Sequence, residues 1–223
     1  ILRDNGGHAV ALHNSMSMVY GVGPGDVFWA ASDVGWVVGH SYIVYAPLLA
    51  GCTTVIFEGK PVGTPDAGTF WRVCAQHGVK VLFTAPTAIR AIKKEDPEGA
   101  LLAKHDLSRL EALYLAGERC DPDTITWSER LLGKPVVDHW WQTETGWTIT
   151  GNFRGLGLFP TRPGSGGKPA PGYDVVVLDE AHQEVPRGQI GSLAVRLPLP
   201  PSCLQTLLNA DDRFRDAYLS AHP

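Results

Sequence analysis

The chain has 223 residues, of which 44% are hydrophobic and 19% charged, a composition typical of a globular protein and not of a disordered or collagen-like one. The formal net charge of −4 gives no electrostatic reason to expect nucleic acid or an anionic membrane as a partner. The four cysteines are scattered without metal-ligand spacing, and no apolar run approaches the roughly 18 residues of a transmembrane helix. Single, dispersed cysteines predict reduced thiols, as in a bacterial cytoplasm or a mitochondrial matrix.

Helical and strand patterns alternate over the first two thirds of the chain. The apolar spacing predicts helices over 6–20, 40–50, 66–77, from 86 onward and over 122–131, and strands over 27–31, 53–57, 80–84, 113–116 and 136–137. This alternation implies parallel strands joined by right-handed crossovers, so we expect an α/β fold: a layered, mostly parallel sheet with helices on both faces. Ligands collect beyond the carboxyl ends of such strands, which here precede the segments after Ala31, Ala116 and Val137.

The composition changes at about Gly151. Gly, Pro, Arg and Thr dominate as far as Pro171, and two β-rich stretches follow at 173–178 and 192–197. We therefore expect an α/β unit over 1–150 and a small β-rich, barrel-like unit over 151–223. The tail over 204–219 has a helical pattern, and we expect that helix to have no anchor on the rest of the chain.

The stretch D-H-W-W-Q-T-E-T-G, at 138–146, carries the most chemical information. It places two indoles, hydroxyls and a carboxylate directly after a predicted strand. A nucleotide site needs an aromatic plane, donors for phosphate and a carboxylate for Mg2+, which prefers hard oxygen ligands. On composition alone, an aromatic core strand followed by a polar turn explains the same letters equally well.

Six motifs in order resemble those of the adenylate-forming superfamily, which includes acetyl-CoA and propionyl-CoA synthetases. One is W-W-Q-T-E-T-G, and the others are S-D-V-G-W-V-V-G-H-S-Y (32–42), F-E-G-K-P (57–61), F-T-A-P-T-A-I-R (83–90), A-G-E (116–118) and P-G-S-G-G-K-P-A-P-G (163–172). The phrases A-S-D-V-G-W-V-V-G-H-S-Y and A-G-E-R-C-D are more similar to the propionate branch than to the acetate branch, where G-E-P is usual. The chain thus resembles short-chain acyl-CoA synthetases, and propionate–CoA ligases most of all.

The resemblance implies a role for each matching position. Trp140 would stack on adenine, Asp138 and His139 would present their backbone to the adenine edge, Thr143 would contact the α-phosphate, and Glu144 would hold Mg2+. Thr143 and Glu144 are therefore the expected catalytic residues. The expected nucleotide-binding positions are Gly117, Glu118, Arg119, Asp138, His139, Trp140, Trp141, Gln142 and Thr143.

The family's acyl pocket corresponds to Val37, Val38, Ala116 and Trp141, with Trp141 as the floor that excludes long chains. Acetate-specific relatives tend to carry Val where this chain has Ala116. The smaller side chain opens room for about one methylene, whose burial stabilises by about 0.8 kcal/mol. Apolar pockets discriminate by about 1 to 3 kcal/mol per methylene, so we expect a preference for propionate. The alternative is that Ala116 is small only because strand packing requires it.

Three further features receive no catalytic role. His40 and Tyr42 are expected to pack at a helix start near the acyl pocket. The segment 164–168 lacks the first glycine of a Walker loop, so it is expected to be a turn with Lys168 solvated. Val62 stands where acetyl-CoA synthetases often place an Asn near CoA, and no CoA contact is assigned.

The resemblance implies a ligase that uses ATP, Mg2+ and CoA. The substrate carboxylate attacks the α-phosphorus of ATP, and CoA thiolate then attacks the acyl-adenylate. An acetyl-CoA synthetase and a non-catalytic nucleotide-binding relative are the alternatives, and no oligomeric state is predicted. The family's phosphate loop, its T-G-D motif and its adenylation lysine have no match, so we expect an internal segment of a longer protein, inactive by itself.

Overall fold

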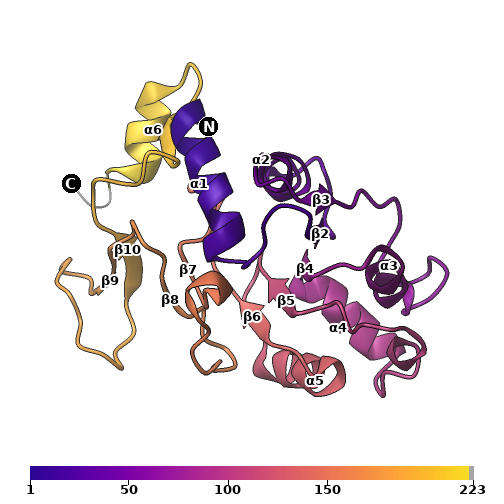
Figure 1. Ribbon diagram of the computed structural model, residues 1–223. Coiled ribbons are helices and arrows are strands. Elements are labelled where there is room, and N and C mark those ends of the chain that lie inside the picture. The colour runs from indigo at the N-terminus through magenta and orange to yellow at the C-terminus, as the bar shows by residue number, and fades with distance from the viewer. Residues whose placement is uncertain (221–223) are drawn as a thin grey trace.

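The computed structural model of this chain describes residues 1–220 and centres on a five-stranded parallel sheet (Figure 1). The order across the sheet is β3-β2-β4-β5-β6. The strands are β2 (Val27–Ala30), β3 (Thr53–Thr54), β4 (Val81–Thr84), β5 (Ala112–Leu115) and β6 (Val136–Asp138). All four pairings are parallel, which confirms the predicted sheet.

Helices cover both faces of this sheet, also as predicted. Alternate strand residues point to opposite faces: Phe83 and Tyr114 belong to one apolar cluster, whereas Leu82 and Leu113 belong to the other. The first cluster packs against α1 (Asn5–Met18), the π-helix η1 (Gly39–Tyr45) and α2 (Ala46–Leu49); the second packs against α3 (Thr69–His77), α4 (Pro86–Glu95) and α5 (Pro122–Leu132). Figure 1 shows α1 and α2 on one side of the sheet and α4 and α5 on the other.

Local chemistry sets the helix ends. Pro86 and Pro122 occupy first-turn positions, where a missing N–H costs nothing. Asp121 caps α5 by accepting a 2.8 Å hydrogen bond from Thr124 N. Gly78 and Gly133 end α3 and α5 with φ values of +60° and +61°, which non-glycine residues rarely adopt.

From Thr150 onward the chain forms short antiparallel pairs, one of them with the N-terminal strand. These are β7 (Thr150–Gly151) with β8 (Lys168–Pro169), β9 (Val175–Leu178) with β10 (Ser192–Val195), and β1 (Leu2–Arg3) with β11 (Leu204–Thr206). The two stretches predicted as strands, 173–178 and 192–197, contain β9 and β10, which pair with each other. Within residues 1–220 these pairs remain three separate two-stranded sheets and close into no barrel. Two single 3-10 turns, η2 (Leu102–Lys104) and η3 (Arg154–Leu156), complete the connections.

The prediction for the tail was wrong in two respects. Residues 204–206 form β11, paired with the N-terminal strand, and the helix α6 begins only at Asp211 and ends at Tyr218. The tail is also anchored, because Tyr218 Oη donates a 2.8 Å hydrogen bond to Glu144 Oε1. None of the helices in the described part of the chain combines the length and apolar character needed to cross a bilayer.

Candidate active site

The strand register brings the predicted site segments together at one edge of the sheet. Thr84 pairs with Leu115, and Leu115 pairs with Asp138. These are the last residues of β4, β5 and β6. The segments that follow must therefore lie side by side, which is where ligands bind in sheets of this kind.

Two adjoining cavities open at this edge. The first, of about 720 Å³, is lined by eight predicted nucleotide residues: Gly117, Glu118, Arg119, Asp138, His139, Trp140, Trp141 and Gln142. The second, of about 620 Å³, is lined by the four predicted acyl-pocket residues and the two predicted catalytic residues: Val37, Val38, Ala116, Trp141, Thr143 and Glu144. Gly117, Trp141 and Gln142 belong to both walls. Every predicted site residue thus lines one cavity or the other, and Thr143 and Glu144 line the second.

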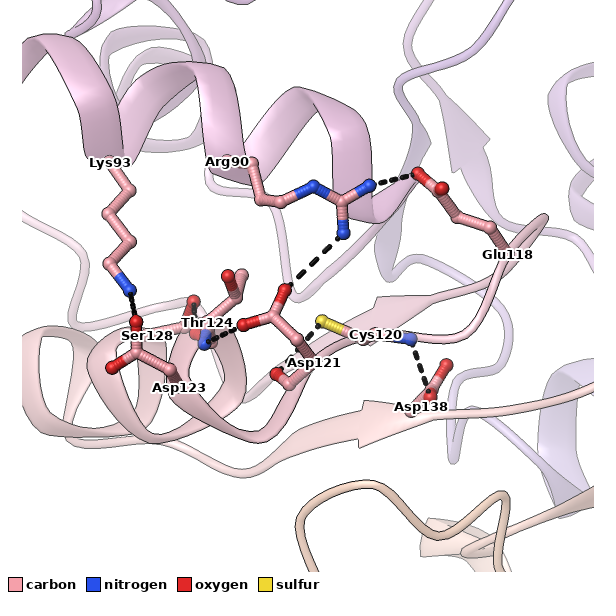
Figure 2. Close-up of polar contacts among 9 residues, drawn as sticks. All are labelled: Arg90, Lys93, Glu118, Cys120, Asp121, Asp123, Thr124, Ser128 and Asp138. Carbon is pink, nitrogen blue, oxygen red and sulfur yellow. Dashed lines mark hydrogen bonds and ion pairs between the residues drawn. The ribbon is translucent and has the colours of Figure 1, made fainter.

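Polar contacts fix the turn after β5, which forms a wall of the first cavity (Figure 2). Cys120 N donates a 3.0 Å hydrogen bond to Asp138 Oδ2, which joins the ends of β5 and β6. Arg90 of α4 bridges Glu118 Oε1 at 2.5 Å and Asp121 Oδ2 at 3.4 Å. Sequence reasoning quoted Arg90 within a motif but gave it no part in the site.

Asp138 and His139 are both buried, and burial shifts their pKa values in opposite directions. Burial raises the pKa of the Asp138 carboxyl to about 6, against the lowering effect of the Cys120 N–H. Burial lowers the pKa of the His139 imidazole to about 4. Leu115 O lies 2.8 Å from His139 Nδ1, so Nδ1 carries the proton, and Nε2 accepts from Tyr20 Oη at 3.1 Å. The His139 side chain is therefore committed to the core, which fits the predicted backbone role.

The indole of Trp141 is held as a fixed wall between the cavities. Its ring meets the Tyr42 ring edge-on, with centroids 5.5 Å apart, and lies 6.5 Å from the Phe83 ring. Tyr42 is fully buried and its hydroxyl donates to Ser15 Oγ at 3.0 Å, so the predicted packing role of Tyr42 is confirmed. His40, by contrast, is exposed and lines neither cavity, so the packing role predicted for it is wrong.

The Thr143–Glu144 turn is supported from behind by both ends of the described chain. Arg3 Nη2 donates to Thr143 O, Leu204 N donates to Glu144 O at 2.7 Å, and Tyr218 Oη donates to Glu144 Oε1. Gly146 follows with φ +75°, and a Cβ there would lie 1.8 Å from Arg3 Nη1. Sequence reasoning missed Arg3 and Tyr218, because nothing local marks contacts across 140 and 74 residues.

The carboxylate of Glu144 could hold a magnesium ion if phosphate oxygens supplied the other ligands. Residues 1–220 contain no group of three or more His, Cys, Asp or Glu side chains placed to hold a metal. Glu144 is the sole carboxylate on the wall of the second cavity. Magnesium sites of phosphate-transferring proteins commonly use one or two carboxylates with phosphate oxygens as the other ligands, so Glu144 satisfies the chemistry.

Several lining residues were missed although they stand within the quoted motifs. Ser32, Trp36, Phe83, Thr84 and Ala85 complete the second cavity. Gly164, Gly166 and Gly167 line the first, so the glycine-rich turn forms part of the wall of that cavity. Lys168 is exposed, as predicted, with Nζ 4.9 Å from the centroid of the Phe159 ring.

Comparisons with known proteins agree with this geometry. The chain is 54% identical over 224 aligned positions to acyl-CoA synthetase short-chain family member 3, mitochondrial, of Homo sapiens, covering 100% of the chain and 33% of that protein. It is 51% identical over 222 positions to propionate–CoA ligase of Escherichia coli, covering 99% of the chain and 35% of that protein. The chain therefore spans about a third of the length of these curated relatives.

A solved structure and a family model give the same result. The crystal structure of Brucella canis acyl-CoA synthetase superposes with a TM-score of 0.77 at 36% identity, covering 88% of this chain and 35% of that one. The model of the family described as AMP-binding enzyme matches residues 7–200, most of the chain. The chain belongs to the AMP-binding enzyme family.

Proposed function

We propose that the protein carrying this chain is an AMP-forming ligase that joins a short carboxylate, preferably propionate, to CoA. The observation that carries the proposal is the pair of adjoining cavities that share Gly117, Trp141 and Gln142. One cavity has an aromatic and backbone wall suited to adenine. The other, of about 620 Å³, carries Val37, Val38 and Ala116 on its wall beside the Trp141 indole. This arrangement would bring the α-phosphorus of ATP next to a short acyl group at the shared wall.

The chemistry requires positioning more than proton transfer. The substrate carboxylate is already ionised at neutral pH, so it attacks the α-phosphorus without a base, and pyrophosphate leaves. CoA thiolate then attacks the acyl-adenylate and AMP leaves. Trp140 would stack on adenine, and Thr143 would donate to the α-phosphate. Glu144 would hold Mg2+, whose charge offsets that of the phosphates.

The acyl preference rests on Ala116. Its side chain is 6% exposed and lies on the cavity wall with Val37, Val38 and Trp141. The names of two similar proteins, a short-chain acyl-CoA synthetase and a propionate–CoA ligase, support the same substrate class. An acetyl-CoA synthetase remains the competing assignment, because a cavity that accepts three carbons also admits two.

Two structural predictions belong with this proposal. We propose that the domain boundary lies near residue 150, and that the short sheets after it become part of a barrel-like unit in the longer protein. The compartment would be a bacterial cytoplasm or a mitochondrial matrix. The 223-residue segment alone would be inactive, because residues outside it would have to hold the triphosphate and CoA.

The test is kinetic and uses the full-length protein. We expect propionate-dependent exchange of pyrophosphate into ATP, and a kcat/KM for propionate above those for acetate and butyrate. An advantage of tenfold or more for acetate would transfer the assignment to acetyl-CoA synthetase. AMP binding without any carboxylate-dependent exchange would establish the non-catalytic alternative instead.

A further inference from the structure

The predicted magnesium ligand is held by a side chain from the far end of the described chain. Tyr218, the last residue of α6, donates from Oη to Glu144 Oε1 at 2.8 Å. The backbone of Glu144 is fixed as well, since Leu204 N donates to Glu144 O at 2.7 Å. Glu144 is therefore bound through both its carboxylate and its carbonyl by the segment that contains β11 and α6.

Other contacts place this segment against the site. β11 pairs with β1 at the N-terminus, so Arg3 and Leu204 are register partners. Arg3 in turn donates to Thr143 O. Within α6, the rings of Phe214 and Tyr218 have centroids 5.6 Å apart, which restricts the position of the phenol. The β1–β11 pair and the helix α6 therefore hold the Tyr218 hydroxyl in position.

The kind of donor matters for a metal ligand. A carboxylate on a flexible side chain loses rotational freedom when it binds a cation, and a pre-formed hydrogen bond to one oxygen removes part of that cost in advance. An arginine or lysine in the same place would neutralise the carboxylate and compete with the cation. A phenol donates without carrying charge, so its hydrogen bond to Glu144 Oε1 adds no cation that would compete with the metal.

We propose that Tyr218 is a positioning residue that orients the Glu144 carboxylate toward the magnesium and phosphates of bound ATP. This inference rests on the proposed function, which assigns Glu144 to the metal. Tyr218 itself touches neither substrate nor metal in this scheme. It acts only through Glu144, so its effect must depend on the carboxylate being present.

The test compares Tyr218→Phe in the full-length protein with wild type and with Tyr45→Phe. Phenylalanine keeps the ring that packs on Phe214 and removes only the hydroxyl. Tyr45 is a matched control because it is 52% exposed, on η1, and lines neither site cavity. The first measurement is Mn2+ affinity in the presence of a non-hydrolysable ATP analogue, read from the electron paramagnetic resonance of free Mn2+.

We expect Tyr218→Phe to weaken Mn2+ binding about 3- to 10-fold, the size of one hydrogen bond to a charged group at a partly exposed position. The Mg2+ concentration for half-maximal pyrophosphate exchange should rise by the same factor, while kcat at saturating Mg2+ and the unfolding temperature stay close to wild type. Tyr45→Phe should change none of these quantities.

Glu144→Gln supplies the decisive comparison. In that background, adding Tyr218→Phe should cause no further loss of Mn2+ affinity. If Glu144→Gln weakens the metal and Tyr218→Phe behaves like Tyr45→Phe, the positioning role is overturned while the proposed function stands. A loss from Tyr218→Phe that persists without the carboxylate also overturns it. If Glu144→Gln has no effect on Mn2+ binding or exchange, the assignment of Glu144 fails, and the positioning role fails with it.

Discussion

The backbone N of Cys120 lies 3.0 Å from Oδ2 of Asp138, and this hydrogen bond joins the two strand ends beside the first cavity (Figure 2). Asp138 is 8% exposed, so its charge is poorly solvated although its position is well fixed. The N–H could also donate to a neutral amide oxygen, although more weakly than to the carboxylate. An experiment can therefore separate the position of the Asp138 side chain from the free-energy cost of burying its charge.

We predict that Asp138→Asn stabilises the protein at neutral pH. The pKa of this carboxyl is raised to about 6 from an ordinary value of 3.8, because burial penalises the anion. A raised pKa favours the native state below the unfolded pKa, and that contribution is lost as pH rises through the native pKa. The free energy of unfolding of the variant should therefore rise relative to that of wild type between pH 4 and 6. Above pH 6 the difference should be about 2 to 3 kcal/mol.

Urea unfolding of both proteins at pH 4, 5, 6 and 7.5 measures this difference. Asp106→Asn is the control, because that carboxyl is exposed and the N–H and hydroxyl of Ser108 lower its pKa. Its variant should show no gain as pH rises. A free-energy difference for Asp138→Asn that is the same at pH 4 and pH 7.5 would contradict the raised pKa.

Substitutions of Ala116 should move the acyl preference in both directions. Ala116→Val narrows the second cavity beside Trp141, so kcat/KM for propionate should fall by about tenfold or more while that for acetate changes little. Ala116→Gly enlarges the same space and should improve butyrate relative to propionate. Steady-state kinetics with the three acids checks both. Equal losses for all three acids in both variants would mean that Ala116 serves strand packing alone.

Arg90→Met should weaken ATP binding with little loss of stability. The pairs of Arg90 with Glu118 and Asp121 are more than a third exposed, so each contributes well under about 1 kcal/mol to folding. Their removal frees the turn that lines the nucleotide cavity, so KM for ATP should rise about 3- to 10-fold at nearly constant kcat.

The matched control is Lys93→Met on the same helix. Lys93 pairs with Asp123, away from the turn, and lines neither cavity (Figure 2). An equal rise of KM in both variants would assign the effect to general loosening of α4 and α5.

Gly146→Ala should destabilise more than Gly78→Ala. Both glycines have positive φ, +75° and +60°, so each alanine costs about 1 to 2 kcal/mol in the left-handed region. Only at Gly146 does the new Cβ also meet neighbours, Arg3 Nη1 at 1.8 Å and His8 Cε1 at 2.9 Å. Urea midpoints measure the difference, and Arg3→Ala should recover part of the Gly146→Ala loss. Equal effects at the two glycines would show that the close approach of Arg3 carries no cost.

The sequence was sufficient for the parallel sheet because its signals are local. The spacing of apolar residues indicates buried strands and amphipathic helices. Gly78 marks the end of a helix because it adopts positive φ, and Pro86 marks the start of one because its φ is fixed. The strand predicted over 53–57 stops at Thr54. Beyond it, Ile56 is 80% exposed and Phe57 turns its ring to Trp29, with centroids 5.6 Å apart, so side-chain packing draws the chain off the sheet edge.

Long-range partners could not be read in the same way. The pattern over 204–206 suits a helix locally, but β1 offers it an unpaired edge about 200 residues away, and tertiary pairing overrides propensity. The positions of Arg3 and Tyr218 against the Thr143–Glu144 turn depend on that pairing. Part of the lining of the two cavities was predicted through resemblance, whereas the contacts of Arg3 and Tyr218 behind it emerged only from the fold.

Gly117, Trp141 and Gln142 form a partition between the two cavities, and this has a consequence for how the acid specificity of such a protein could change. A substitution in the partition would alter the proposed adenine site and the proposed acyl site together. Higher activity with a new acid would then come with lower affinity for ATP. Ala116, Val37 and Val38 face the acyl side alone. Drift between acids that differ by about one carbon should therefore pass through these three positions, whereas acceptance of long chains would require replacement of Trp141, the expected floor.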